Sequence, residues 1–304
     1  MSVLVVGDAG LDITLVVDHR PGADEKVHAL RELRHAGGVA ANTAVGLARL
    51  GSLPWLVAAL GDDPFGELVQ GDLVAAGLDQ ALVRRLPGES TYYSVSLVDA
   101  AGEKALVVVP SGRLYPTAEQ LPATLPAGAR WLHTVPYDVS LAAAWTDLAR
   151  AAGVPISIDL EPATMTTGID SLRAVLQDAD TVIVNRRAVE RSGLRADGLT
   201  SRLSVWGVRN VLRTGGSSGV VLWQGGCAAL SVTPPPVDVV DTTGAGDALA
   251  AGYIHARLTG QRVGEAVRYG CITGALSCAA LGAQAALPDA ATVDAVWRRE
   301  TAQR

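Results

Sequence analysis

The sequence predicts an α/β fold in which a central, mostly parallel sheet is covered by helices on both faces. Short apolar runs alternate with segments of helical period along most of the chain, which is typical of that architecture. With 49% hydrophobic and 18% charged residues, the 304-residue chain can bury a large core. Between residues 91 and 109 the apolar period changes to two, which predicts a small β lid. We expect one domain over residues 1–304, with the lid formed by about 13–36 and 88–112.

The first part of the chain carries three kinds of pattern. Continuous apolar runs that end at a turn predict buried strands, and apolar residues recurring every three to four positions predict helices. Two period-two segments on either side of a turn at 99–103 predict the hairpin of the lid. In chain order, these patterns give a strand at 3–6, a helix at 40–50, a strand at 55–60, a helix at 67–76, and hairpin strands at 93–98 and 105–109.

The second part of the chain alternates strand and helix, as expected for parallel strands joined by helical crossovers. The pair Gly225-Gly226 predicts a second hairpin turn. Residues 270–288 hold no charged side chain, and they predict a buried helix because their small side chains are too weakly apolar for a membrane span. The other predicted elements are strands at 131–135, 155–160, 181–185, 210–214, 219–224 and 228–232, and helices at 140–152, 169–177, 199–206 and 248–258.

Composition and charge disfavour several classes of function. The formal net charge of −6 argues against a nucleic-acid partner, because phosphate binding needs a broad basic face. Three cysteines without a C-x-x-C pair indicate neither a disulfide framework nor a zinc site, and they fit a reducing compartment. The N-terminus lacks the basic region of a signal peptide. We therefore expect a cytoplasmic protein that binds neither nucleic acid nor a membrane.

Residues 241–247, which read D-T-T-G-A-G-D, carry the strongest chemical signal. The N–H groups of Gly244, Ala245 and Gly246 are expected at the start of a helix, where unpaired donors and the helix dipole favour an anion. Asp247, in the same turn, can accept the proton of a hydroxyl that attacks a bound phosphoryl group. The motif also fits an aspartate that only completes a helix N-terminus after a glycine-rich turn, so by itself it leaves both interpretations open.

A second group of candidate residues lies near the first predicted strand. Gly37 and Gly38 allow a ligand to approach the backbone closely, and Asn42 offers both donors and an acceptor. Asp12 follows the first strand by a few residues, and an open α/β sheet binds its ligand just beyond the ends of its strands. Taken singly, each of these residues also fits a plain turn, a helical asparagine or a solvated aspartate.

Together, these residues resemble the PfkB/ribokinase family of carbohydrate and nucleoside kinases. Gly37-Gly38 with Asn42 is similar to the family's N-terminal pattern, and residues 241–247 with Ala251-Gly252 are similar to its C-terminal one. Residues 61–66 and the late Gly-Ala-Gln segment also resemble family segments, so the likeness spans nearly the whole chain in the right order. The resemblance implies a ribokinase-like sheet covered on both faces, with a small β-sheet lid.

The resemblance also implies that the chain transfers the γ-phosphoryl of ATP to a hydroxymethyl group of a sugar. Asp247 is the expected general base, and the N–H groups of Gly244, Ala245 and Gly246 are the expected anion hole. The other expected roles are substrate binding by Asp12, Gly37, Gly38 and Asn42, nucleotide binding by Asn185, Thr214, Gly216, Gly219 and Thr243, and a monovalent-cation site at Asp241, Thr243, Ser277, Ala280 and Gly282. The implied cofactors are ATP and Mg²⁺, with K⁺ as a further candidate, and the implied assembly is a homodimer through the lid.

The sequence departs from the family pattern at three places. The family's N-x-x-E segment, which is linked to Mg²⁺ and phosphate, reads N-R-R-A at 185–188 here, so Ala188 replaces the glutamate. Glu190 lies two residues further on and is a candidate substitute. Gly10 and Val39 stand where ribokinase proper has an asparagine and a lysine, which disfavours ribose itself.

These departures leave the substrate open between two classes. A ketohexose or pentose-like sugar is the first expectation. A nucleoside such as pseudouridine is the alternative, for which Tyr92, Tyr93 or Tyr115 would have to stack on a base rather than pack in the lid. A non-catalytic sugar-binding sensor on the same fold is a third alternative, which the intact Asp247 disfavours.

Overall fold

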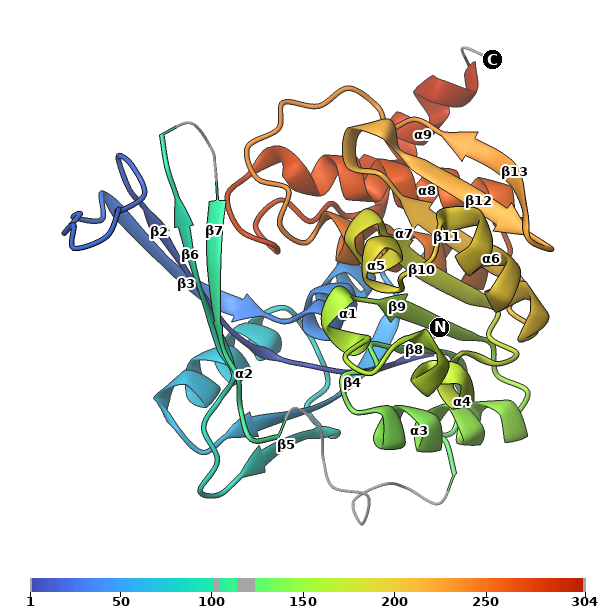
Figure 1. The fold of residues 1–304 in the computed structure, drawn as a ribbon, viewed down its shortest axis with the longest axis horizontal. Helices are drawn as coiled ribbons and strands as arrows, with labels where there is room; N and C mark the ends of the chain where they lie inside the picture. The colour runs from blue at the N-terminus through green and yellow to red at the C-terminus, as the bar shows by residue number, and fades with distance from the viewer. Residues whose placement is uncertain (1, 101–103, 114–123, 303–304) are drawn as a thin grey trace.

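The structure is a computed structural model that describes residues 2–100, 104–113 and 124–302 (Figure 1). Within these residues the strands form two sheets, one of nine strands in the order β13-β12-β11-β10-β9-β8-β1-β4-β5 and one of four in the order β3-β2-β6-β7. We call them the large sheet and the small sheet. The predicted α/β class, with a mostly parallel central sheet and a separate small β-sheet, is confirmed.

The large sheet is parallel from β5 to β11, and only β12 and β13 run antiparallel at one edge. The parallel strands inside the sheet are buried on both faces along most of their length, which is why the sequence shows continuous apolar runs there, whereas the edge strand β5 carries the exposed Arg84. The strands are β1 (Ser2–Val6), β4 (Leu53–Gly61), β5 (Val83–Leu86), β8 (Ala129–Thr134), β9 (Ile156–Leu160), β10 (Thr181–Asn185), β11 (Asn210–Thr214), β12 (Val220–Gln224) and β13 (Cys227–Val232).

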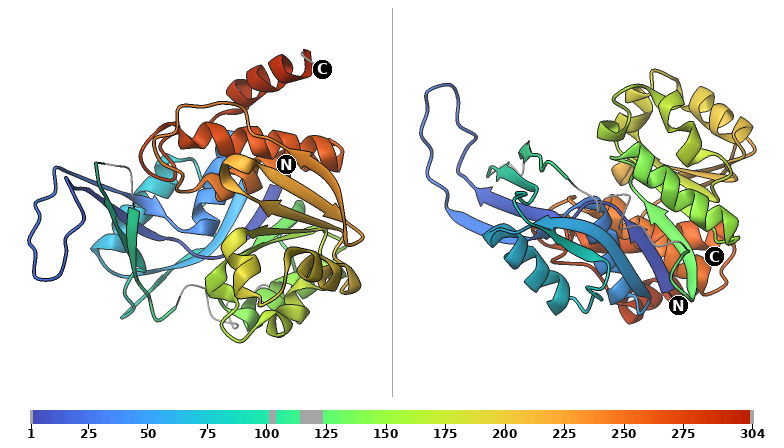
Figure 2. Two further views of the ribbon diagram at one scale, coloured as in Figure 1. Left: turned by 45° about the horizontal axis from the view of Figure 1, so that its top comes forward. Right: turned by 90° about the horizontal axis from the view of Figure 1, so that it is seen from below.

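Helices cover the large sheet on both faces, as Figure 2 shows. Successive side chains of a strand point to opposite faces, so Val3 and Val5 of β1 join one core cluster whereas Leu4 and Val6 join the other. The first cluster includes residues of α1 (Val39–Arg49), α7 (Ala245–Leu258) and α8 (Val263–Leu276), with α9 (Ala290–Ala302) beside them. The second includes residues of α3 (Val139–Ala151), α4 (Arg173–Leu176), α5 (Arg186–Arg191) and α6 (Ala196–Val205).

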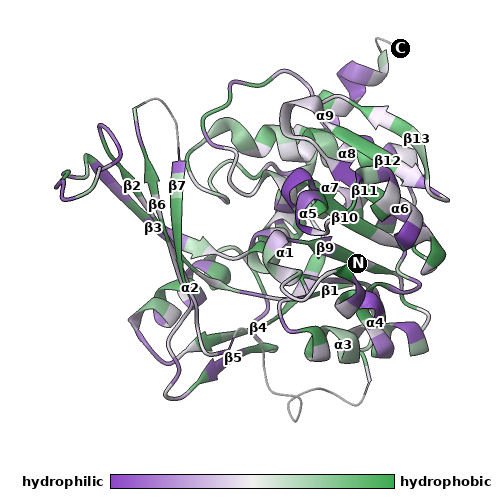
Figure 3. Cartoon of the chain, viewed as in Figure 1, coloured by the Kyte–Doolittle hydropathy of each residue, from purple (hydrophilic) through white to green (hydrophobic). Residues whose placement is uncertain are grey.

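The small sheet projects from one side of this body (Figures 1 and 2). Its strands are β2 (Gly10–Val16), β3 (Arg31–Gly37), β6 (Tyr93–Val98) and β7 (Lys104–Val109). The predicted hairpin is β6–β7, although part of its turn, 101–103, lies outside the described residues. The helix α2 (Pro64–Ala75) packs beside β2 and β3, where the Phe65 and Tyr93 rings meet edge to face at 5.2 Å. Figure 3 shows β7 as an apolar strand and the β2–β3 connection as hydrophilic.

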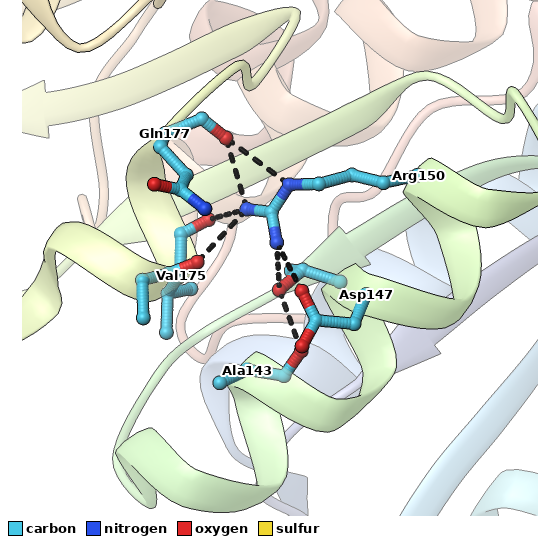
Figure 4. A network of polar contacts seen from close by, with 7 residues as sticks. Ala143, Asp147, Arg150, Val175 and Gln177 are labelled. Atoms are coloured by element: carbon cyan, nitrogen blue, oxygen red, sulfur yellow. Dashed lines mark hydrogen bonds and ion pairs between the residues drawn. The ribbon is translucent and has the colours of Figure 1, made fainter.

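The predicted helix at 169–177 is wrong in its detail. The chain forms a 3₁₀ turn over Ile169–Leu172 and then only the four residues of α4. The guanidinium of Arg150, on α3, donates to the carbonyl oxygens of Ala174, Val175 and Gln177 at 3.0, 2.8 and 2.9 Å, and it also bonds to Asp147 (Figure 4). The Arg150 guanidinium therefore supplies the hydrogen bonds that these carbonyl oxygens would otherwise receive from a further turn of helix.

The prediction of one buried helix over 270–288 is also wrong. The helix α8 ends at Leu276, and a 3₁₀ turn and an irregular loop follow it. The loop is held by hydrogen bonds from the distant segment 240–241, whose N–H groups donate to the Cys278 carbonyl at 2.8 and 3.2 Å. Tertiary hydrogen bonds thus replace the helical ones that the uniform small-residue composition suggested.

None of the helices in the described part of the chain is long and apolar enough to cross a membrane.

Candidate active site

The motif at 241–247 forms the start of α7, as predicted. Gly244 is the N-cap residue and has φ 78°, a left-handed conformation that favours glycine. A Cβ at this position would also lie 2.8 Å from the Ala283 carbonyl oxygen, so glycine is required by packing as well. Ala245 N donates to the Thr242 carbonyl over a long 3.3 Å, while the N–H groups of Gly246 and Asp247 belong to the first helical turn, which has no intrahelical acceptors.

Asp247 is buried in this first turn and faces other acidic groups. Its side chain accepts a hydrogen bond from Asn42 Nδ2 at 2.8 Å. Burial raises the pKa of Asp247 well above its usual range; the Asn42 bond acts to lower it, and the charges of Glu161, Asp8 and Asp12 raise it further. A carboxylate with a raised pKa holds a proton more tightly, which suits a group that must accept one from a hydroxyl.

Asn42 connects the catalytic candidate to the predicted substrate group. It lies in α1, directly after the Gly37-Gly38 turn, and its Oδ1 accepts a hydrogen bond from Gln284 Nε2 at 2.9 Å. The Asn42 side chain is therefore fixed at both ends, by Gln284 and by Asp247. The sequence could indicate Gln284 only as part of a family-like segment, because its partner lies 242 residues away.

Asp12 lies in β2 against the first glycine of the turn. A Cβ on Gly37 would sit 2.1 Å from Asp12 Oδ2, so the absence of a side chain is what admits the carboxylate. Asp12 Oδ1 accepts the Ser94 hydroxyl at 2.5 Å. Gly38 has φ 101° and is the N-cap residue of α1. The structure thus brings together Asp12, Gly37, Gly38, Asn42 and Asp247.

Asp8 is a further acid at this place that sequence reasoning did not single out. Its carboxylate accepts the N–H groups of Val39 and Ala40 at 3.2 and 3.1 Å, so it caps the N-terminus of α1 from the end of β1. Burial raises its pKa to about 6, although the backbone hydrogen bonds act to lower it. The available signal was its position, one residue after the first strand ends in Gly7.

Asp241 organises the segment that precedes the anion hole. Its Oδ1 accepts the backbone N–H and the hydroxyl of Thr243 at 2.9 and 2.6 Å, and its Oδ2 accepts Gly282 N at 2.9 Å. Partial burial acts to raise the pKa of Asp241, but these hydrogen bonds and the charge of Lys104 lower it overall. Three of the residues predicted to bind a monovalent cation, Asp241, Thr243 and Gly282, are thus in direct contact with one another through the Asp241 carboxylate. The Ser277 hydroxyl instead donates to the Gly274 carbonyl at 2.9 Å.

Four of the five residues predicted to bind the nucleotide lie at or just after the ends of the adjacent strands β10 and β11, and the fifth, Thr243, precedes α7. Asn185 and Thr214 are register partners at the carboxyl ends of β10 and β11. Gly216 and Gly219 follow β11 in a short 3₁₀ turn with φ 59° and 84°. A Cβ on Gly219 would lie 1.9 Å from the Val232 carbonyl oxygen, so a larger residue would displace the hairpin strand β13.

Glu161 was missed by sequence reasoning and lies beside Asn185. Asn185 Nδ2 donates to Glu161 Oε1 at 3.2 Å, while Asn185 Oδ1 accepts Ala188 N and caps α5. Burial and the charge of Asp8 raise the pKa of Glu161, and Arg187 acts to lower it. Glu190, the predicted substitute for the missing glutamate, instead pairs with exposed Arg186 at 3.9 Å. Glu161 is therefore the carboxylate that the fold places next to Asn185.

The three tyrosines considered for base stacking have different surroundings. Tyr93 packs against Phe65, which indicates a packing role. Tyr92 is half-buried near the acidic groups: burial first, and then the charges of Asp8 and Asp12, raise the pKa of its phenol. Tyr115 lies outside the described residues.

Comparisons with known proteins show which family of sequences and which fold the chain resembles. A family model described as pfkB family carbohydrate kinase matches residues 1–290. The chain is 34% identical over 298 residues to the ATP-dependent ribose-1-phosphate kinase of Halopiger xanaduensis, covering 97% of each chain, and 28% identical to the pseudouridine kinase of Escherichia coli, covering 91% of this chain and 90% of that one. The crystal structure of a putative ribokinase from Agrobacterium tumefaciens superposes with a TM-score of 0.87 at 24% identity, covering 100% and 99%.

The chain therefore belongs to the pfkB family of carbohydrate kinases. It is an ATP-dependent phosphotransferase that acts on an alcohol group, and its substrate is a small sugar or nucleoside. The family resemblance stated from the sequence is confirmed.

Proposed function

We propose that the protein transfers the γ-phosphoryl of ATP to a hydroxymethyl group of a small sugar, a ketohexose or pentose-like compound. The observation that carries this proposal is the position of Asp247: it is buried in the first turn of α7 and joined through Asn42 to the Gly37-Gly38 turn. One carboxylate is thereby shared by the start of an anion-binding helix and by a cluster of groups suited to sugar hydroxyls.

The chemistry assigns one role to each group. The acceptor oxygen forms a bond to the γ-phosphorus, the bond from that phosphorus to the β–γ bridging oxygen breaks, and ADP leaves. The proton of the acceptor hydroxyl passes to Asp247. The N–H groups at Gly244, Ala245 and Gly246, with the α7 dipole, stabilise the charge on the transferring group, since phosphoryl transfer is catalysed mainly by positioning and electrostatics. In this proposal Asp12, Gly38 and Asn42 hold the other hydroxyls.

The proposed cofactors are ATP and Mg²⁺. Mg²⁺ is usually bound through one or two carboxylates together with substrate phosphates, and the half-buried Glu161 beside Asn185 supplies a carboxylate of the required kind. When bound, the ion would neutralise phosphate charge. The hydrogen bonds that join Asp241, Thr243 and Gly282 support a single K⁺ site formed by these residues. Ser277 and Ala280, in the segment after α8, would supply further ligands to the ion. Thr214, Gly216 and Gly219 would line the nucleotide.

A nucleoside is the second candidate substrate. The specific observation for it is Tyr92, whose half-buried ring lies close to Asp8, Asp12 and Asp247, so that it could stack on a base next to the acceptor hydroxyl. A non-catalytic sensor is disfavoured, because Asp247 and the glycines of its turn are all in place.

The small sheet is proposed to act as a lid over the substrate and to pair with the small sheet of a second copy. Its edge strand β7 leaves Leu106, Val107 and Val108 exposed by 54, 61 and 48%. An apolar edge strand of this kind favours pairing with another strand.

We also propose a cytoplasmic location, on the ground that Cys227, Cys271 and Cys278 are free thiols.

The proposal is tested by measuring ADP release from ATP and Mg²⁺ against a panel of sugars, sugar phosphates and nucleosides, with and without K⁺. We expect turnover with a free sugar. Asp247→Asn should reduce kcat at least about a hundredfold, because the general base is lost. Since burial raises the pKa of Asp247, the acid limb of the kcat/KM profile should lie above the ordinary range of an aspartate, with activity lost as pH falls.

The matched control is Asp238→Asn, at an exposed aspartate outside the site. It should turn over like the wild type. Near-normal turnover in Asp247→Asn would refute the base assignment, and ADP release only with nucleosides would favour the second substrate class.

A further inference from the structure

Lys104 joins the small sheet to the segment in front of the anion hole. It is the first residue of β7, and its ammonium donates to Thr243 Oγ1 across 139 positions of sequence. The same Nζ lies 4.0 Å from Asp241 Oδ1. The chain contains only one other lysine, Lys26, so a lysine at this place is not the product of a lysine-rich surface.

The register of the small sheet places Lys104 on the same face as the proposed substrate residue. Asp12 is paired with Ser94, and Ser94 with Val108. Lys104 lies four residues before Val108 on β7, and residues separated by an even number share one face of a strand. The face of the small sheet that carries Asp12 therefore also carries Lys104, and it is this face that reaches the start of α7.

Lys104 stands at the end of a chain of hydrogen bonds. Its acceptor, the Thr243 hydroxyl, donates to Asp241 Oδ1 at 2.6 Å, and Asp241 Oδ2 accepts Gly282 N at 2.9 Å. This chain links three segments that are far apart in the sequence: the edge strand of the small sheet, the residues just before Gly244, and the loop that follows α8. A displacement of the small sheet would therefore remove one restraint on the residues that position the anion hole.

We propose that Lys104 is a positioning residue which couples closure of the small sheet over the substrate to the geometry of the phosphoryl-binding turn. The inference rests on the proposed kinase function. Lys104 acts through Thr243: with the sheet closed, the ammonium holds residues 241–243, and the N–H groups that follow are correctly placed for the transferring group. A lysine suits this role because its long stem reaches between elements and its head offers three donors.

A purely structural ion pair would behave differently. The Lys104 side chain is 33% exposed, and surface ion pairs contribute little to stability. We therefore expect Lys104→Met to leave the thermal midpoint within about 2 °C of the wild type while lowering kcat about tenfold. ATP affinity, measured by titration, should change less than about threefold, because the loss falls on the placement of the transferring group.

The experiment compares Lys104→Met, Lys104→Arg and the control Lys26→Met, whose lysine is exposed in the connection between β2 and β3 and is not among the proposed site residues. ADP release is measured with ATP and Mg²⁺ and with D-fructose, D-ribose or pseudouridine, whichever is turned over fastest. Lys104→Arg should retain at least about a third of kcat, and Lys26→Met should retain all of it. Adding Thr243→Val to Lys104→Met should lower kcat by a smaller factor than Thr243→Val does in the wild type, because part of the Thr243 effect passes through its contact with Lys104.

A second measurement does not depend on activity. Amide hydrogen exchange in residues 241–246 of the free protein should be several-fold faster in Lys104→Met than in the wild type or in Lys26→Met. Unchanged exchange together with unchanged kcat, or additive losses in the double variant, would overturn the proposal. If the wild type and Lys104→Met turn over equally while Asp247→Asn is inactive, the kinase function stands and this inference fails. If no acceptor is turned over, unchanged exchange still refutes the coupling and faster exchange still supports it.

Discussion

The large and small sheets of this protein bury their apolar side chains to different extents. In β1 of the large sheet, Val3 to Val6 are all inaccessible to solvent, with alternate side chains in two separate cores. In β7 of the small sheet, the apolar residues Leu106, Val107 and Val108 remain largely exposed. Burial stabilises the first region by itself, whereas the second carries apolar surface that its own fold does not cover. The small sheet therefore offers exposed apolar surface, whereas the strands of the body do not.

The candidate site lies where the two regions meet. The body contributes Asn42 and Asp247 from α1 and α7, and the small sheet contributes Asp12 and Lys104. Asp8 lies at the junction, between the last residue of β1 and the first of β2. The two regions are expected to differ in stability and in their contacts with a second chain, and the charge at their junction is expected to affect stability.

The largest effect is expected when the same truncation is made in both sheets. Leu132 in β8 is fully buried, so Leu132→Ala should lower the free energy of unfolding by about 2–5 kcal/mol. Leu106 in β7 is 54% exposed, and Leu106→Ala should cost less than about 1 kcal/mol. Urea unfolding of both variants measures the difference. Equal losses in the two variants would show that the small sheet is as tightly packed as the body, and would contradict the expected difference in burial between the two sheets.

The second prediction concerns the junction. Asp8 has its pKa raised to about 6 in the folded protein, against 3.8 as its ordinary value, so the folded state binds its proton more tightly than the unfolded state does. Its contribution to stability is therefore most favourable below about pH 3.8, and it declines as pH rises to about 6. Two pKa units correspond to a loss on the order of 3 kcal/mol across this window.

Asp8→Asn removes this titration. Its free energy of unfolding, relative to the wild type, should therefore rise between pH 4 and pH 6.5 by about 2 kcal/mol, because this interval covers most of the titration. Denaturant unfolding at both pH values gives the change, and Asp238→Asn, at an exposed aspartate, serves as the control. Parallel pH profiles for wild type and Asp8→Asn would contradict the raised pKa.

The smallest effect on stability is expected at the exposed edge of the small sheet. Val107→Lys should change the free energy of unfolding by less than about 0.5 kcal/mol, since the side chain is 61% exposed. The same change should dissociate a dimer formed through β7, because a charge on an edge strand opposes strand pairing. Light scattering measures the molar mass, with Val205→Lys on α6, at an 84% exposed valine, as the control. A mass equal to that of the wild type in both variants would exclude β7 as the contact.

The sequence predicted most elements of the body because their patterns are local. The apolar runs predicted as strands at 155–160 and 181–185 reappear as β9 and β10, and the period-two segments reappear as the hairpin β6–β7. The predictions failed where distant groups replace local hydrogen bonds, as Arg150 does at the end of α4 and segment 240–241 does after α8. Strands β2 and β3 were anticipated only as part of a lid, because their mixed polar pattern reflects contact with α2 and the site rather than two-sided burial.

The amino-acid sequence by itself determined the α/β class and the family, and it determined that Asp247 lies in the first turn of a helix that follows Gly244. These properties follow from backbone preferences and hydrophobic period, which act over a few residues. Only the tertiary structure decided which polar groups meet: Glu161 with Asn185, Lys104 with Thr243 and Gln284 with Asn42. Such pairs join segments 24 to 242 residues apart, and their contact depends on how sheets and helices pack, which no local pattern encodes.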